Sequence, residues 1–178
     1  VTEKSGVLNL GLEGLMLVGA VSGFISLVIT GNYFYSFILS ILSGVILSSI
    51  FAFFVLRLLT NQIATGLALT IFGIGLSAML GKKFSGTPIN GLSPYYLIIF
   101  SFILVFLINY ILYKTKAGLI IRAVGENHHS AYALGYDVIK TRYLTIIFGG
   151  VMCSLAGFYI SVWYAPMWQE GMTAGRGW

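Results

Sequence analysis

Charged side chains are scarce in this chain, and their scarcity excludes most soluble folds. Only 8% of the 178 residues are Asp, Glu, Lys or Arg, against about 25% in typical soluble domains. Hydrophobic residues make up 58% of the chain, and a soluble fold of this size lacks the polar cover to hide them. A bilayer removes that requirement. We therefore predict an all-α polytopic transmembrane helical bundle, because lipid offers no partners for open backbone groups.

Residues that catalyse reactions or bind metals are also few. The single cysteine, Cys153, lies inside an apolar run, so we expect a small packing residue rather than a nucleophile. His128 and His129 are adjacent and would point about 100° apart on a helix, which makes them a poor metal pair. The nearest approach to a phosphate-binding P-loop, Gly81-Lys82-Lys83, lacks the upstream glycine and a following Ser or Thr. We expect no enzyme activity, no cofactor and no metal site in this chain.

Five apolar stretches each approach the roughly 20 residues that cross a bilayer as a helix. They are predicted at Leu10–Thr30, Tyr33–Leu56, Ile63–Leu80, Tyr95–Tyr113 and Tyr143–Trp163. No cleavable signal peptide is evident before them. Because the chain starts at Val1 and stops at Trp178 without a return helix, we expect a single partial membrane domain over residues 1–178, with further helices at both ends.

Basic residues orient the predicted bundle. The longest polar stretch, residues 114–142, holds five of the 10 basic residues and is placed in the cytoplasm. Because successive spans cross the membrane in opposite directions, Arg57 is then placed inside, and the loop Gly81–Pro94, with its two lysines, is placed outside. An outer aromatic belt is expected at Trp163, Tyr164, Trp168 and Trp178. The pI near 9.4 follows from these basic flanks, so nucleic-acid binding is not expected.

Polar residues in apolar surroundings are candidates for a solute path. Asn9 and Glu13 lie four residues apart and share one face if their segment is helical, although nearby glycines could let the backbone break. A carboxylate at membrane depth is costly, so Glu13 either faces a cavity or ties two helices together.

A second polar cluster, Asn61, Gln62 and Thr65, lies at the head of the third apolar stretch. Its members either contact solute or serve ordinary helix capping and interfacial solvation, and the second interpretation is slightly favoured. Gly19 and Gly23 have a GxxxG spacing, for which helix packing is the favoured interpretation.

A short helix is predicted inside the cytoplasmic stretch, between Glu126 and Gly135. Asn127 is a good N-cap and Gly135 a good terminator. Such a helix, flanked by basic residues, could dock on a cytoplasmic partner; the alternative is a helix that rests on lipid headgroups. Composition alone does not decide between the two.

Several stretches of the chain resemble the permeases of ABC importers in the branched-chain amino acid, ribose and nucleoside group. They are Glu3–Gly14, Asn61–Leu69, Arg122–Asn127 with Ala131, Gly135 and Tyr136 beyond it, and the tail Met172–Trp178. The first of these stretches ends in Leu12-Glu13-Gly14, and this ending is most similar to that of the second of two paired permeases in nucleoside (simple sugar) uptake systems. Such permeases often have proline after the coupling-loop Asn, whereas this chain has His128, so the helix lacks a preset first turn.

The resemblance implies a multi-pass permease subunit in a bacterial plasma (inner) membrane, which forms the translocation path for a small polar solute. That solute is expected to be a nucleoside, with simple sugars and branched-chain amino acids left open. The implied partners are a cytoplasmic ATP-binding subunit that hydrolyses ATP, a second permease subunit, an extracytoplasmic solute-binding protein or lipoprotein, and membrane lipid.

The resemblance also points to the coupling helix, which would comprise Gly125, Glu126, Asn127, His128, Ala131, Leu134 and Gly135. The candidates for the solute path remain the polar residues Asn9, Glu13, Asn61, Gln62 and Thr65. An ATP-independent secondary transporter or channel is the alternative function. An integral membrane enzyme is disfavoured, because His and acidic residues do not cluster at one membrane face.

Overall fold

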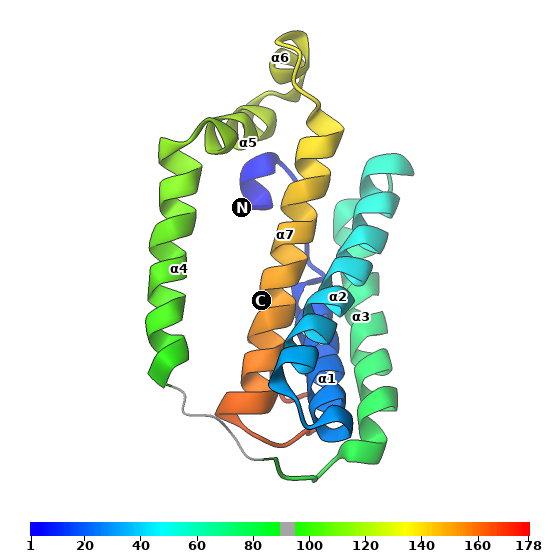
Figure 1. The fold of residues 1–178 in the computed structure, drawn as a ribbon. Helices are drawn as coiled ribbons and strands as arrows, with labels where there is room; N and C mark the ends of the chain where they lie inside the picture. The colour runs from blue at the N-terminus through cyan, green and yellow to red at the C-terminus, as the bar shows by residue number, and fades with distance from the viewer. Residues whose placement is uncertain (90–94) are drawn as a thin grey trace.

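The fold is a bundle of helices in a computed structural model that describes residues 1–89 and 95–178. In chain order the described helices are η1 (Glu3–Ser5), α1 (Leu12–Thr30), α2 (Tyr33–Ala52), η2 (Phe53–Arg57), α3 (Gln62–Gly81), η3 (Lys82–Phe84), α4 (Tyr95–Lys114), α5 (Lys116–Glu126), α6 (His128–Ala133), α7 (Val138–Tyr159) and η4 (Ile160–Tyr164) (Figure 1). The π-helical turns η2 and η4 continue α2 and α7. The predicted all-α bundle is confirmed.

Among the described residues, four helices are long and apolar enough to cross a membrane, at Leu12–Thr30, Tyr33–Arg57, Gln62–Phe84 and Val138–Tyr164. These agree with four of the five predicted spans, except that the last begins at Val138, five residues before Tyr143. The fifth predicted span corresponds to α4, which meets α5 at a bend of 72°. Part of the predicted outer loop Gly81–Pro94, residues 90–94, lies outside the described residues.

The centre of the bundle is a trio of helices, α1, α2 and α7, that small residues bring close together. A Cβ at Gly19 or Gly23 of α1 would overlap Ser154 or Phe158 of α7. The prediction that this GxxxG spacing serves packing is therefore confirmed. Ser40 of α2 and Ser154 of α7 also exchange buried hydrogen bonds. Close backbone approach and such polar bonds are what hold helices together in lipid.

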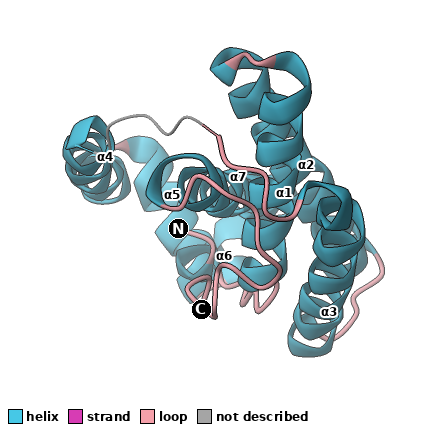
Figure 2. Cartoon of the chain, turned by 90° about the horizontal axis from the view of Figure 1, so that it is seen from below, coloured by secondary structure: helices cyan, strands magenta, loops and turns pink. Residues whose placement is uncertain are grey.

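The α4 helix stands apart from this trio, and α5 is its main partner among the described residues (Figures 1 and 2). The bend comes where Thr115 ends one helix and caps the next, its hydroxyl accepting from the backbone N–H of Gly118. The α5 helix is amphipathic: Val124 is fully buried beneath it and Leu119 is exposed. It crosses the end of the bundle rather than continuing the span.

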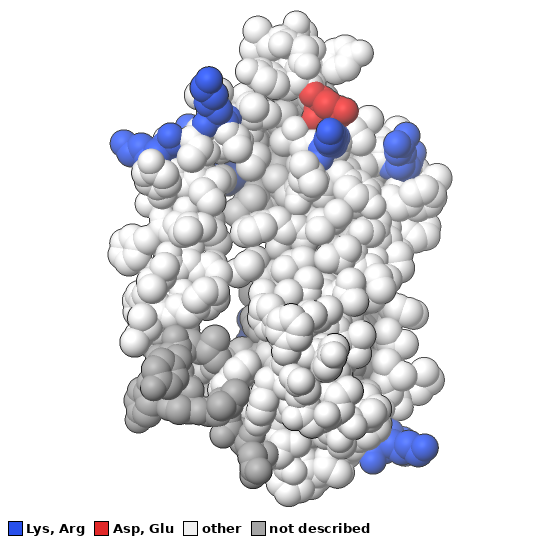
Figure 3. Space-filling view, in the orientation of Figure 1, with Lys and Arg blue, Asp and Glu red and all other residues white. Residues whose placement is uncertain are grey.

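Basic side chains gather at the end of the molecule that carries α5 and α6, and a smaller group lies at the opposite end (Figure 3). This is the end that the sequence places in the cytoplasm. The α7 helix leads away from this end. It begins at Val138, before the predicted start at Tyr143, because Asp137 provides its N-cap: the Asp137 side chain accepts a hydrogen bond from the backbone N–H of Lys140.

The predicted outer aromatic belt is only partly correct. Tyr164 and Trp178 are exposed, and Trp163 is half-buried. Trp168, however, is only 1% exposed. It packs with Leu17 and Phe24 of α1, and its indole fills the space where Gly81 lacks a side chain. The segment after η4 therefore folds onto the bundle instead of lying flat at the membrane surface.

Candidate functional site

The first candidate site lies where α1 begins, beside the middle of α3. The α1 helix starts only at Leu12, and residues 7–11 before it are not helical. A Cβ at Gly73 of α3 would lie 2.5 Å from the Cα of Gly14, so the two backbones touch about halfway along α3. The start of α1 is thus placed at mid-depth in the bundle. Asn9 and Glu13 do not share a helical face, because Asn9 precedes the helix.

Glu13 is buried, with 6% of its surface exposed, and both of its carboxylate oxygens accept hydrogen bonds. Oε1 accepts from the Thr173 hydroxyl at 2.5 Å and from the backbone N–H of Gly175 at 2.9 Å. Oε2 accepts from the backbone N–H of Gly177 at 2.6 Å. All three donors come from the C-terminal segment, and none of them carries a charge. Trp178 in this segment was expected at the outer membrane surface, yet the segment bonds to Glu13, and Figure 1 marks the C-terminus about halfway along the bundle.

In the non-helical stretch before α1, side chains pair three of the backbone groups. The Gln62 side-chain oxygen accepts from the backbone N–H of Leu8 at 2.8 Å, and the Thr70 hydroxyl donates to the carbonyl of Leu10 at 2.9 Å. Asn9 is buried and its side-chain oxygen accepts from the backbone N–H of Gly11. Paired backbone groups of this kind permit non-helical chain at membrane depth.

The second polar cluster divides by role. Asn61 caps α3, its side chain accepting from the backbone N–H groups of Ile63 and Ala64. The Thr65 hydroxyl bonds to the Asn61 carbonyl and to Thr60. These contacts match the capping interpretation for Asn61 and Thr65. Gln62 differs, because it joins α3 to the stretch before α1.

The second candidate site is the tip formed by α6, which projects beyond the end of the bundle (Figure 1). The predicted helix boundaries are confirmed: the Asn127 side chain accepts from the backbone N–H of Ser130, and Gly135 follows with φ of +86°. Within α6, Ala131 is buried in the chain. Tyr132 and Leu134 are 76% and 75% exposed. The face free for a partner is therefore that of Tyr132 and Leu134, and not that of Ala131.

The remaining residues predicted for coupling form the joint between α6 and the rest of the bundle. Gly125 lies at the end of α5, where a Cβ would overlap the carbonyl of Lys4. The η1 turn thus sits directly under α5, held on α7 by hydrogen bonds from Thr2 to the carbonyl of Thr145 and between Ser5 and the Thr145 hydroxyl. Glu126 and His128 are exposed on either side of the Asn127 cap.

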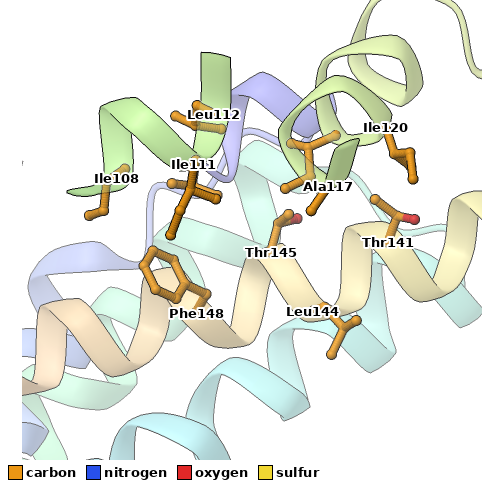
Figure 4. A pocket seen from close by; sticks show the side chains of 11 residues that line it. Ile108, Ile111, Leu112, Ala117, Ile120, Thr141, Leu144, Thr145 and Phe148 are labelled. Atoms are coloured by element: carbon orange, nitrogen blue, oxygen red, sulfur yellow. The ribbon is translucent and has the colours of Figure 1, made fainter. Parts of the chain in front are cut away.

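A third feature is a pocket of about 450 Å³ between α4, α5 and α7. Figure 4 shows its lining of apolar side chains, such as Ile111, Leu144 and Phe148, with two threonines contributed by α7. None of the predicted path residues lines it. A pocket with so few polar groups cannot orient a polar solute, which needs placed hydrogen-bond partners.

No metal centre is formed by the described parts of the chain, where no three of the His, Cys, Asp and Glu side chains are grouped to hold an ion. The rings of His128 and His129 lie 4.1 Å apart on α6, and both side chains are exposed.

This arrangement of helices long and apolar enough to cross a membrane is that of a multi-pass membrane protein. Residues 1–177 match the family described as the permease component of the branched-chain amino acid transport system. The chain therefore belongs to this permease family and is a multi-pass protein of the plasma membrane.

Three curated relatives show the kinds of permease to which the chain is similar. TsgC13 of Haloferax volcanii, whose name assigns it as a glucose ABC transporter permease protein, is 36% identical over the whole chain. The guanosine ABC transporter permease protein NupQ of Bacillus subtilis and the nucleoside ABC transporter permease protein NupC of Lactococcus lactis are each 27% identical over 99% of it. The chain spans 61% of the length of TsgC13 and 65% of the other two. No solved structure gives a significant match.

Several residues of the first site were missed from the sequence. Thr173, Gly175 and Gly177 lie some 160 positions from their partner Glu13, and nothing in their local pattern predicts the contact. Thr70 was missed because a single threonine in an apolar helix is unremarkable there. The α5 helix had a readable signal, since Thr115 is a typical N-cap and apolar residues recur after it at helical spacing.

Proposed function

We propose that this chain forms part of the translocation path of an ATP-driven importer for a nucleoside or a simple sugar. The single observation that carries the proposal is the α6 tip: a capped helix outside the membrane-crossing region, with Tyr132 and Leu134 about three-quarters exposed. A helix of six residues is not stable by itself in water. Two large exposed apolar side chains on it favour a protein partner that covers them.

In this proposal the partner is a cytoplasmic ATP-binding subunit, and ATP is hydrolysed there and not on this chain, which needs no cofactor of its own. A second permease subunit completes the path, and an extracytoplasmic solute-binding protein delivers the solute. The names of the three relatives, which refer to glucose, guanosine and nucleosides, support the solute class. When α6 moves with its partner, the motion is transmitted to the bundle at Gly125, because Gly125 packs directly against Lys4 of η1.

The test is uptake in proteoliposomes that contain the full-length permease with its candidate ATP-binding subunit, paired permease and binding protein. We expect labelled guanosine or glucose to accumulate only when ATP is inside and loaded binding protein is outside. The ATP-binding subunit should also co-purify with the permease. Uptake of equal rate without ATP would instead establish the secondary transporter, and failure to co-purify would remove the role given to α6.

A further inference from the structure

We propose that Glu13 is a solute-contacting residue that accepts hydrogen bonds from the hydroxyl groups of a neutral solute, and that Thr173 and its neighbours occupy this carboxylate when solute is absent. The inference rests on the proposed function, which it deepens by naming the residue and the chemistry that it recognises. The juxtaposition that carries it is a buried carboxylate at mid-depth whose donors all belong to one segment of the chain.

The environment of Glu13 sets it apart from a structural ion pair. Buried carboxylates are ordinarily balanced by a cation, but the donors here are one hydroxyl and two backbone N–H groups. The basic residue within the same segment, Arg176, lies instead over the ring of Tyr164, 5.6 Å from its centre. Glu13 also lies in the first turn of α1, where the helix dipole favours negative charge. The site therefore holds a carboxylate that uncharged hydrogen-bond donors satisfy.

The segment that supplies these donors is attached beyond Trp168 by the packing of Met172 and by its three bonds to Glu13. That tryptophan is firmly packed, but Gln169, Glu170 and Gly171 are exposed, and within residues 169–178, all of which the structure describes, Thr173 alone is buried. Ala174 has a φ of +47°, a backbone conformation that costs energy for a residue with a side chain. The three bonds to Glu13 are thus the polar attachment that a solute would replace, beside the packing of Met172 on the bundle.

The three donors indicate which chemical groups of a solute could replace them on the Glu13 carboxylate. The Thr173 hydroxyl donates to Glu13 in the way that a sugar or ribose hydroxyl would. The N–H groups of Gly175 and Gly177 mark two further directions from which the carboxylate accepts. A solute with several hydroxyl or N–H donors can take over all three bonds as the segment withdraws. A solute with a carboxylate of its own would meet like charge in surroundings of low polarity, where repulsion is strong. Neutral polyhydroxylated solutes are thus favoured over amino acids.

The first experiment measures uptake rates of guanosine, of glucose and of their single-deoxy analogues by the reconstituted importer, at saturating loaded binding protein. For whichever parent solute the wild type transports, at least one deoxy analogue should be transported about tenfold more slowly or worse. In Glu13→Gln, which keeps the size but loses the charge and one acceptor, this difference should shrink to within about threefold. Glu170→Gln makes the same change on an exposed glutamate of the same segment and should leave the analogue pattern as in the wild type.

The outcomes separate the inference from the function on which it rests. If Glu13→Gln slows the parent and every analogue equally, Glu13 is structural and the inference is wrong, while the importer stands. If the wild type transports leucine but neither guanosine nor glucose, the inference and the proposed solute class are both wrong, while the ATP-driven importer stands. If the wild type transports none of the three solutes with ATP, the proposed function fails and takes the inference with it.

If Glu13→Gln does not assemble, a second variant tests whether Thr173 occupies the Glu13 carboxylate in the absence of solute. Thr173→Val preserves the shape of the side chain and removes the hydroxyl that holds Oε1 of Glu13. Because solute then competes with one bond fewer, the concentration of loaded binding protein that gives half-maximal uptake should fall severalfold. A half-maximal concentration that is unchanged or raised would overturn the role of Thr173 as a stand-in for solute.

Discussion

Removing the side chain of Leu134 should weaken docking of the ATP-binding subunit without disturbing the permease itself. Burying a whole leucine side chain gains about 1.5–3 kcal/mol, and Leu134 has 75% of its surface available to a partner. Leu134→Ala should therefore lose about 1–2 kcal/mol of binding free energy, which is roughly a 5- to 30-fold rise in Kd. The fold around it should persist, because the turn is held by the backbone bond from Tyr136 N–H to the Ala131 carbonyl.

The measurement is a titration of the ATP-binding subunit onto the permease in lipid nanodiscs, with ATP hydrolysis stimulated by loaded binding protein as a second readout. Leu119→Ala is the matched control: Leu119 is also exposed, at 56%, but it lies on α5 rather than at the tip. We expect the control to bind as the wild type does. The reasoning is refuted if Leu134→Ala also binds with wild-type Kd and supports wild-type hydrolysis, and α6 would then be a helix that rests on lipid headgroups.

Two further predictions concern the orientation and the packing of the bundle. A cysteine at Ser85 should react with an impermeant maleimide in intact cells and a cysteine at Ser130 only after permeabilisation, because basic residues gather at the end that carries α6, where Ser130 lies; the reverse pattern would invert the topology. Gly157→Ala should lower the thermal unfolding temperature in detergent by the equivalent of about 1–3 kcal/mol, because its Cβ would overlap the carbonyl of Met16. Gly75→Ala, which has open space, should leave that temperature unchanged or raise it, and equal temperatures for the two variants would contradict the packing argument.

The parts of the fold that the sequence predicted are those governed by local chemistry. Apolar runs of about 20 residues located the spans, and cap chemistry located α6, because Asn127 and Gly135 act on their immediate neighbours. The GxxxG spacing of Gly19 and Gly23 was interpreted correctly as packing for the same reason: small residues on one helix face leave room for another helix.

The parts that could not be predicted depend on contacts between distant positions. Glu13 was recognised as unusual, but its partner Thr173 lies 160 residues away, and no local pattern specifies that pairing. Trp168 was placed at the membrane surface because aromatic residues after a span commonly lie there, whereas Gly81 opens a space that only the folded bundle reveals. Ala131 was predicted as part of the coupling helix, and its burial depends on how α6 packs on its neighbours.

The non-helical stretch Val7–Gly11 makes the chain a tether between the two candidate sites. Its upper end follows η1, on which Gly125 rests, and its lower end leads into α1 at Glu13. Five residues of backbone reach at most about 18 Å when fully drawn out, so this tether has a fixed maximum length. The stretch is also bonded to α3, through Gln62 to Leu8 and through Thr70 to Leu10, so a displacement of η1 would act on α3 as well as on the first turn of α1.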